Sequence, residues 1–369
     1  MSRDIIRVGI IGTGVGIRTH LPAFRALKDA EVVALAGSNE QRARFFARKH
    51  GIERAMDYLS LCSLPEIDLV CVASPNPCHR VEVAAALDAG KHVLCEKPLA
   101  MSVQETRELN EMSLARPDQL ALVNHQLRFN PYVRRVKQLI ADGAIGRPYY
   151  LRLHQQSTGF ADRHAPWSWS FDSSQGGGVR LAMAPHLIDL VLYWFGRRIE
   201  TVCGAMDPVV LERPASDGAM TQVQASSFFS ASLELEGGLS VNLSATAASC
   251  AVPGFDFCLY GEEGELYFNL VDKLRGAFLK RRGAVEVIPV AAVSASEREN
   301  RVSIFSGSFT YFAPEIVNSI RTGDWSGLEP AAKFSDAQDV QVALEALARA
   351  ANTGAMQRLA GQQRSDDVV

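Results

Sequence analysis

The sequence contains no continuous stretch of eighteen or more apolar residues, so it predicts no membrane-spanning helix. Charge is sparse and mixed: the formal net charge is −3 at pH 7, and no five like charges follow one another. A nucleic acid or an anionic membrane would need a concentrated basic face, and we expect neither as a partner. The first residues enter a strand-like segment without the apolar core of a secretory signal, which predicts an intracellular protein.

Cysteine is present but is not arranged for cross-linking or metal binding. The number of cysteines is odd, no CxxC pair occurs, and no histidine joins them at the spacing of metal ligands. Most stand inside apolar runs, where a free thiol packs as a small core residue. We therefore expect a reducing, cytoplasmic location and no metal site. The seven cysteines are Cys62, Cys71, Cys78, Cys95, Cys203, Cys250 and Cys258.

The length of the chain predicts two domains, because 369 residues exceed what one compact core usually holds. The apolar pattern changes after residue 125. We place the first domain at 1–125 and the second at 126–360, and we expect 361–369 to form a disordered tail.

Short apolar runs alternate with amphipathic stretches through the first domain. Helical stretches include 40–50 and 80–89. This alternation predicts an α/β domain whose parallel sheet is covered by helices on both sides. The expected strands are 7–12, 31–36, 68–73, 92–95 and 119–123.

The second domain shows apolar residues that alternate with period two. Gly237 and Gly238 are typical of a two-residue hairpin turn. We expect an α/β domain with a large open, mostly antiparallel sheet that carries helices on one face. A second copy of the chain, in a homodimer or homotetramer, would cover the other face. The expected strands are 149–155, 222–236, 239–246, 255–260 and 264–268, and the expected helices are 132–142, 185–195 and 334–351.

A glycine-rich turn follows the first expected strand, in the order Gly12-Thr13-Gly14-Val15-Gly16. In a dinucleotide-binding turn the first glycine permits a sharp bend and the second lets the backbone approach the pyrophosphate, which sits at a helix N-terminus. The third glycine comes one residue earlier than in the usual GxGxxG spacing. A lone Gly-x-Gly can be a structural turn, but its place after the first strand of a βαβ pattern predicts dinucleotide binding.

Residues at the end of the second strand commonly determine whether a Rossmann domain binds NAD or NADP. NAD enzymes commonly place a carboxylate there to bind the ribose diol, but this strand runs into Gly37-Ser38-Asn39 without one. Ser38 can donate to a 2′-phosphate and Arg42 can supply positive charge. The alternative is that Arg42 is a solvated surface residue. We expect NADP or NAD, with NADP preferred.

A run from Lys91 to Ala100 contains Glu96-Lys97-Pro98, and Pro75-Asn76 and His79 lie upstream. With Gly176-Gly-Gly178 and His186-Leu-Ile-Asp189 in the second domain, the sequence resembles the Gfo/Idh/MocA oxidoreductase family, which includes glucose–fructose oxidoreductase and inositol dehydrogenase. The resemblance covers most of the chain. It implies a Rossmann domain followed by a family-type C-terminal α/β domain.

The resemblance implies that Lys97 reaches the nicotinamide ribose and the reacting substrate oxygen, and that the Lys97–Pro98 bond is cis. The alternative for Lys97 is a surface lysine. The expected cofactor-binding residues are Gly12, Gly14, Val15, Gly16, Ser38, Arg42, Ser74, Pro75, Asn76, His79, Glu96 and Lys97.

His186 is the second catalytic candidate, as general acid or base. The resemblance implies an Asp four residues before it, and this chain has Ala182 there, so the usual proton relay is incomplete. His186 could instead be a helix-start residue bonded to backbone, and Asp189 could serve the helix dipole alone. The expected substrate-binding residues are Lys97, Asn124, Arg128, Trp167, His186 and Asp189.

These residues predict an NAD(P)-dependent dehydrogenase or reductase. It would move a hydride between nicotinamide and a carbinol or carbonyl carbon of a small sugar, polyol or derivative. Two alternatives stay open: a dinucleotide-binding regulator without catalysis, and a relative that uses transient oxidation for elimination or hydrolysis.

Overall fold

The computed structural model describes residues 4–37, 39–215, 217–250, 253–291, 293 and 303–359. The expectations for Ser38 and for the tail 361–369 lie outside these residues. The chain divides into two compact units: Met1–Val133 with Val293–Gln341, and Arg134–Ala292 with Val342–Val369. The first unit thus includes a late segment that the expected boundary at 125 did not assign to it. Within the described residues, no helix combines the length and apolarity needed to cross a bilayer.

The first unit contains a seven-stranded sheet with the order β17-β6-β5-β4-β1-β2-β3. All its neighbours are parallel except the β17–β6 pair. This order, with its switch point between β1 and β4, is that of a Rossmann fold and confirms the predicted class. The five expected strands are present, while the short β3 and β17 were not expected. Their bounds are β1 Ile6–Ile11, β2 Ala30–Ala36, β3 Arg54–Met56, β4 Leu69–Val72, β5 His92–Cys95, β6 Ala121–Val123 and β17 Ala332–Lys333.

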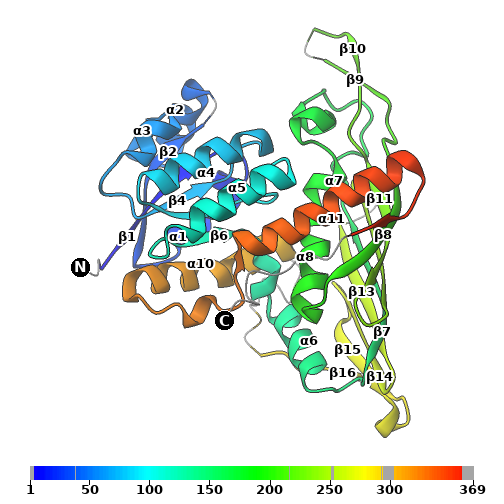
Figure 1. The fold of residues 1–369 in the computed structure, drawn as a ribbon. Helices are drawn as coiled ribbons and strands as arrows, with labels where there is room; N and C mark the ends of the chain where they lie inside the picture. Colours follow the sequence, from blue (N-terminus) through cyan, green and yellow to red (C-terminus); the bar gives the residue numbers. More distant parts are fainter. Residues whose placement is uncertain are drawn as a thin grey trace. The chain divides into compact units, whose positions relative to one another are not determined.

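Helices cover both faces of this sheet (Figure 1). Alternate residues of each strand point to opposite sides, so these apolar strands present an apolar surface on each face. Ile10 of β1 packs in one apolar cluster with Phe309 and Phe312, whereas Ile11 packs in the other with Val83. The helices are α1 Leu21–Arg25, α2 Glu40–Lys49, α3 Tyr58–Cys62, α4 His79–Asp88, α5 Val103–Leu114, α10 Ile304–Thr322 and the start of α11 Phe334–Thr353. Shorter turns are the π-helix η1 Gly16–His20 and the 3-10 helices η2 Asn76–Cys78, η3 Gln126–Phe129 and η7 Ser326–Leu328.

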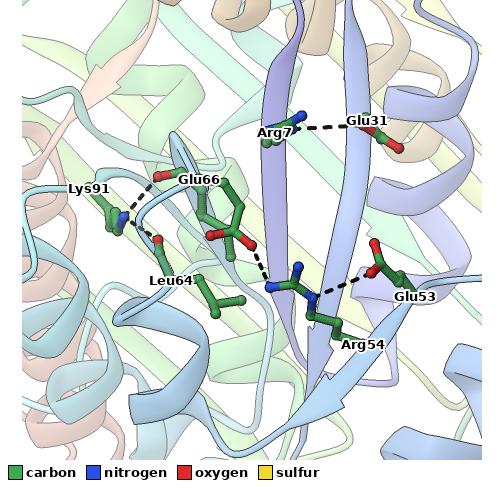
Figure 2. Close-up of polar contacts among 8 residues, drawn as sticks. Arg7, Glu31, Glu53, Arg54, Leu64, Glu66 and Lys91 are labelled. Carbon is green, nitrogen blue, oxygen red and sulfur yellow. Dashed lines mark hydrogen bonds and ion pairs between the residues drawn. The ribbon is translucent and has the colours of Figure 1, made fainter.

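Polar side chains at the amino ends of these strands serve the fold (Figure 2). The Lys91 ammonium, just before β5, donates to the carbonyl oxygens of Leu64 at 2.6 Å and Ile67 at 2.9 Å. Arg54 of β3 pairs with Glu66. The candidate site residues of this unit lie at the opposite, carboxyl ends of the strands. The polar contacts at the amino ends are therefore separate from the candidate site.

The second unit contains a nine-stranded sheet with the order β16-β15-β14-β13-β7-β12-β11-β8-β18. Every pair is antiparallel except β12–β7. The predicted open, mostly antiparallel sheet is confirmed. The bounds are β7 Pro148–Gln156, β8 Ile199–Asp207, β11 Phe228–Leu235, β12 Leu239–Thr246, β13 Gly254–Gly261, β14 Gly264–Asn269, β15 Lys273–Phe278, β16 Val285–Val287 and β18 Gln357–Arg358. A separate hairpin pairs β9 Glu212–Pro214 with β10 Met220–Gln222.

One face of this sheet carries the helices α6 Pro131–Ala141, α7 Val179–Ala182 and α8 Ala184–Phe195 (Figure 1). Trp194 of α8 packs edge-on against Phe257 of β13, with ring centroids 5.0 Å apart. The predicted two-residue hairpin turn is wrong by one residue: Leu235 pairs with Leu239, so residues 236–238 form a three-residue loop, in which Gly237 and Gly238 have φ angles of +79° and +76°. The described residues of this unit also form the 3-10 turns η4 Trp169–Phe171, η5 Ser173–Gln175 and η6 Leu279–Arg281.

Candidate active site

The three glycines after β1 have three distinct roles. Gly12 has φ +126°, and a Cβ there would lie 2.1 Å from the carbonyl oxygen of Ala73, so the turn passes directly over the end of β4. A Cβ at Gly16 would lie 2.6 Å from Ile10 Cγ2, whereas a Cβ at Gly14 would have nothing within 4 Å. A tight bend, open space and close helix–strand packing are the three features that a dinucleotide turn needs. The early third glycine coincides with a π-helical first turn at Gly16–His20.

Arg42 lies against this turn. Asn39 caps α2 by accepting a hydrogen bond from the Arg42 backbone N–H at 2.9 Å. The Arg42 Nε then donates to Thr13 Oγ1 at 3.0 Å, and its guanidinium stacks over Phe46 at 5.6 Å. Arg42 is exposed, as the alternative of a solvated surface residue has it, and these contacts hold its guanidinium beside the turn.

The loop after β4 carries Ser74, Pro75 and Asn76, all half-buried. The Ser74 hydroxyl donates to the carboxylate of Glu82, a buried residue of α4. Burial raises the pKa of Glu82 to about 7. The sequence analysis missed Glu82, although an acid inside the apolar stretch 80–89 was a visible signal.

His79 links two loops of the candidate site. Its side chain is fully buried, and its ring nitrogens lie 2.8 Å from the Pro98 carbonyl oxygen and 3.0 Å from that of Ser74. The ring thus joins the Ser74 loop to the loop after β5, and cofactor contact by His79 stays a prediction.

Glu96 and Lys97 follow β5, and the Lys97–Pro98 bond is cis, as expected. Burial lowers the pKa of the Lys97 ammonium, and the charge of Glu96 acts in the opposite direction. Burial by itself would raise the pKa of Glu96, but the hydrogen bond and charge of His20, together with Lys97 and Asn124, lower it to about 2. Glu96 is therefore a buried carboxylate beside a half-buried ammonium.

Asn124 follows β6 and is fully buried, and its Nδ2 donates to Glu96 Oε1 at 2.7 Å. Arg128, expected to hold substrate, is also buried. Its guanidinium pairs with Asp336 at 3.2 Å and contacts the Pro330 carbonyl oxygen at 3.4 Å. Although burial opposes it, the charge of Arg128 lowers the pKa of Asp336. These contacts favour a structural role for Arg128 over substrate contact.

In the second unit, His186 and Asp189 lie three residues apart on α8 and are both buried, with 6% and 1% of their surface exposed. Ala182, in the short helix before α8, is exposed. The position where the resemblance implies a carboxylate thus lies at the end of α7, before the helix that carries the histidine, and is held by an exposed alanine.

Trp167 belongs to a loop that the β9–β10 hairpin holds. Its backbone N–H donates to the Pro214 carbonyl oxygen at 2.8 Å, and its indole Nε1 donates to that of Gln222 at 3.4 Å. Arg213, which the sequence analysis missed, is 1% exposed and lies 4.0 Å over the Phe171 ring. Its guanidinium donates to the carbonyl oxygens of Phe160, Asp162 and Ala165.

The residues of the first unit fit a nicotinamide dinucleotide. The glycine turn, the Arg42 side chain, the Ser74–Asn76 loop and the Glu96-Lys97 pair all lie at the carboxyl edge of the parallel strands, beside the switch point between β1 and β4. The open space over Gly14 is the cradle that a side chain would fill. Among the described residues, no three His, Cys, Asp or Glu side chains are grouped as metal ligands.

This fold and turn define a dinucleotide-binding protein of the Rossmann class. The sequence model of an oxidoreductase family with an NAD-binding Rossmann fold matches residues 6–125, and that of the GFO/IDH/MocA C-terminal domain matches residues 133–267. Together they cover more than half of the chain, and the chain belongs to the Gfo/Idh/MocA family of oxidoreductases. The predicted family is confirmed.

Two named relatives are dehydrogenases. Glucose-6-phosphate 3-dehydrogenase of Bacillus subtilis is 27% identical over 347 residues, which cover 92% of this chain and 94% of the relative. Levoglucosan dehydrogenase of Pseudarthrobacter phenanthrenivorans is 31% identical over 223 residues, which cover 58% of this chain and 57% of the relative.

Solved structures share the fold. A levoglucosan dehydrogenase in complex with NADH and L-sorbose superimposes with a TM-score of 0.83 at 24% identity, covering 96% of this chain and 99% of that one. The super-repressor mutant of Gal80p from Saccharomyces cerevisiae also superimposes, with a TM-score of 0.79 at 17% identity over 96% of this chain and 98% of that one. The fold by itself therefore does not separate a dehydrogenase from a regulator.

Proposed function

We propose that this protein is a dehydrogenase or reductase that transfers a hydride between nicotinamide and a carbinol or carbonyl carbon of a sugar, polyol or derivative. The observation that carries the proposal is the half-buried Lys97 ammonium at the carboxyl edge of the sheet that bears the open glycine turn. The named relatives, two sugar dehydrogenases, support the substrate class.

Lys97 would act on the substrate oxygen. When bound, the dinucleotide supplies hydride chemistry. The Lys97 ammonium donates a hydrogen bond to the oxygen and stabilises the negative charge that develops there. Because burial lowers the pKa of Lys97, the group can also exchange a proton nearer to neutral pH than an exposed lysine can.

His186 is proposed as the second proton-exchanging group. Asp189 lies one helical turn later on α8. Since Ala182 has no carboxylate to relay a proton, we assign Lys97 the larger share of proton transfer. Asn124 and Trp167 stay proposals for substrate contact; Asn124 would act mainly through Glu96, which it already contacts.

For the cofactor we propose a preference for NADP over NAD. Arg42 brings a guanidinium to the glycine turn through Thr13, and no carboxylate follows β2 before Glu40. An adenosine 2′-phosphate would find a positive charge there, with no acid to repel it. Gly37 has no side chain, and the Asn39 amide caps α2, so neither residue brings a negative charge to this position.

We further propose that the uncovered face of the nine-stranded sheet binds a second copy of the chain. This face carries small polar side chains such as Ser232 and Asn242 beside the ion pair of Arg152 with Asp256, at 2.7 Å. A two-fold axis would place the same strands of the two copies against each other. Seven free cysteines support the proposed reducing, cytoplasmic setting.

Replacement of Lys97 by Met tests the function. Lys97→Met should abolish turnover, followed at 340 nm, and spare dinucleotide binding. Unchanged turnover would remove the proposed role of the ammonium. The exposed Ala182 favours a second candidate, a non-catalytic dinucleotide-binding regulator. A regulator would bind reduced cofactor without oxidising it for any carbonyl compound. A relative that uses transient oxidation for elimination would instead release product with no net change at 340 nm.

A further inference from the structure

A buried polar cluster contains Glu96, the chain neighbour of Lys97, and joins three distant parts of the first unit. His20 ends the π-turn after the glycines, Glu96 follows β5 and Asn124 follows β6. His20 Nε2 lies 2.8 Å from Glu96 Oε1, and Asn124 Nδ2 donates to the same oxygen at 2.7 Å. His20 and Asn124 have no exposed surface, and Glu96 is 7% exposed.

Two of the three side chains in this cluster each leave one polar atom without a hydrogen bond. The imidazole of His20 stacks on Phe309 of α10, with centroids 4.6 Å apart and planes 19° apart, so its plane is fixed. Within the described part of the chain, His20 Nδ1 and Asn124 Oδ1 are buried without a hydrogen-bond partner. Unpaired buried polar atoms cost stability. Both side chains thus direct their donors at one carboxylate and leave their other polar atoms unpaired.

Titratable side chains from several elements surround the Glu96 carboxylate. Lys97 is its neighbour in the chain, His79 faces it from α4, and His20 faces it from the π-turn. Cys71 of β4 and Cys95 of β5 are also near, but burial raises the pKa of both thiols well above the usual value, and they stay uncharged. Among the described residues, the Glu96 carboxylate thus faces His20, His79 and Lys97, together with two uncharged thiols.

We propose that His20 and Asn124 are positioning residues for the Lys97 ammonium: they hold the Glu96 carboxylate ionised and fixed, and its negative charge keeps Lys97 protonated. This proposal rests on the proposed role of Lys97. Burial of an ammonium favours its neutral form, and a neutral amine is a weaker donor to a developing alkoxide. The negative charge of Glu96 favours the protonated form of Lys97 and so opposes the effect of burial. A buried carboxylate stays ionised only when hydrogen-bond donors such as His20 and Asn124 contact it.

Chemical labelling of Lys97 in the cofactor-free protein tests the charge directly. Acetic anhydride reacts with neutral amines, so the labelling rate against pH, followed by peptide mass spectrometry, reports the protonation of Lys97. The exposed Lys49 of α2 is an internal reference in the same digest. In Glu96→Gln the Lys97 labelling rate at pH 8 should rise about tenfold relative to Lys49, equal to a fall of one pKa unit. Glu96→Asp, which keeps the charge, should stay nearer to the wild type.

An unchanged labelling profile in Glu96→Gln would overturn the proposal. This measurement needs no substrate or cofactor, so it stands even if the proposed dehydrogenase activity fails. Conversely, loss of activity in Lys97→Met with an unchanged profile in Glu96→Gln would keep the proposed function and reject this inference.

A second pair of variants covers the case in which Glu96→Gln does not fold. His20→Ala removes the donor to Glu96, whereas Gln at position 20 can still donate one N–H to it. His20→Ala should lower kcat about tenfold or more, with an unchanged cofactor KM and a shifted pH profile, and His20→Gln should recover part of both. A kcat and a pH profile equal to the wild type in His20→Ala would contradict the positioning role, as would an equal loss in both variants.

Discussion

A Cβ atom at Gly16 would lie 2.6 Å from Ile10 Cγ2, so the helix after the glycine turn packs directly on β1 at this point. Gly14, two residues earlier, faces open space. Within one turn, Gly16 therefore serves helix–strand packing, and Gly14 leaves the space in which a ligand can bind.

Gly16→Ala should destabilise the protein by about 1–3 kcal/mol, because the added methyl group overpacks a buried contact with a β-branched side chain. Thermal unfolding measures this loss. Gly14→Ala is the matched control: it should leave the melting temperature within about one degree and weaken dinucleotide binding at least tenfold. Equal melting temperatures for both variants would contradict the assigned roles.

Arg42→Gln should lower the affinity for NADP more than that for NAD. Loss of one guanidinium at a 2′-phosphate costs about 1.5–3 kcal/mol, or roughly ten- to hundredfold in Kd. Arg44, which pairs with Glu40 on the same helix, offers the control substitution Arg44→Gln. If Arg42→Gln changes both affinities by the same factor, Arg42 does not select the cofactor.

The fold was predictable where local pattern decides it. The apolar strands of the first unit and the glycine turn after β1 can be predicted from short windows of the sequence, because the patterns that set them are local. The helix α10 was not expected, because Gly307 and Pro314 interrupt its apolar spacing, although Ser303 caps its start and Gly323 ends it.

The site was predictable only in part. The Glu-Lys-Pro motif gave Lys97, but the contacts of His79 with Pro98 and of Arg213 with its carbonyl oxygens arise between separate segments. Arg213 donates to carbonyl oxygens about fifty residues earlier, at Phe160 and Asp162. No local spacing encodes such a contact, so only the folded chain shows it.

Glu82 predicts a pH dependence of stability. Its pKa rises from 4.5 to about 7 on folding, so the folded state binds more protons between these values and stability falls as pH rises through them. Up to about 3 kcal/mol is lost over this window. Glu82→Gln should be more stable than the wild type at pH 8 and equal to it at pH 4. Parallel stability curves for the two proteins would contradict this.

Arg213→Met should destabilise the second unit by about 2–4 kcal/mol, because it removes a buried guanidinium that donates to three backbone carbonyl oxygens and contacts the Phe171 ring. Denaturant unfolding measures the change. Arg163→Met alters an exposed arginine of the same loop and should stay within about 0.5 kcal/mol of the wild type. Similar losses in the two variants would show that Arg213 has no special anchoring role.

Isothermal titration of the protein with NADPH and NADH tests the central claim most directly. The structure predicts one dinucleotide site per chain, with binding retained within about threefold in Lys97→Met and lost at least a hundredfold in Gly14→Val, whose branched side chain fills the turn. Absence of binding heat with either dinucleotide, at several temperatures, would contradict the account.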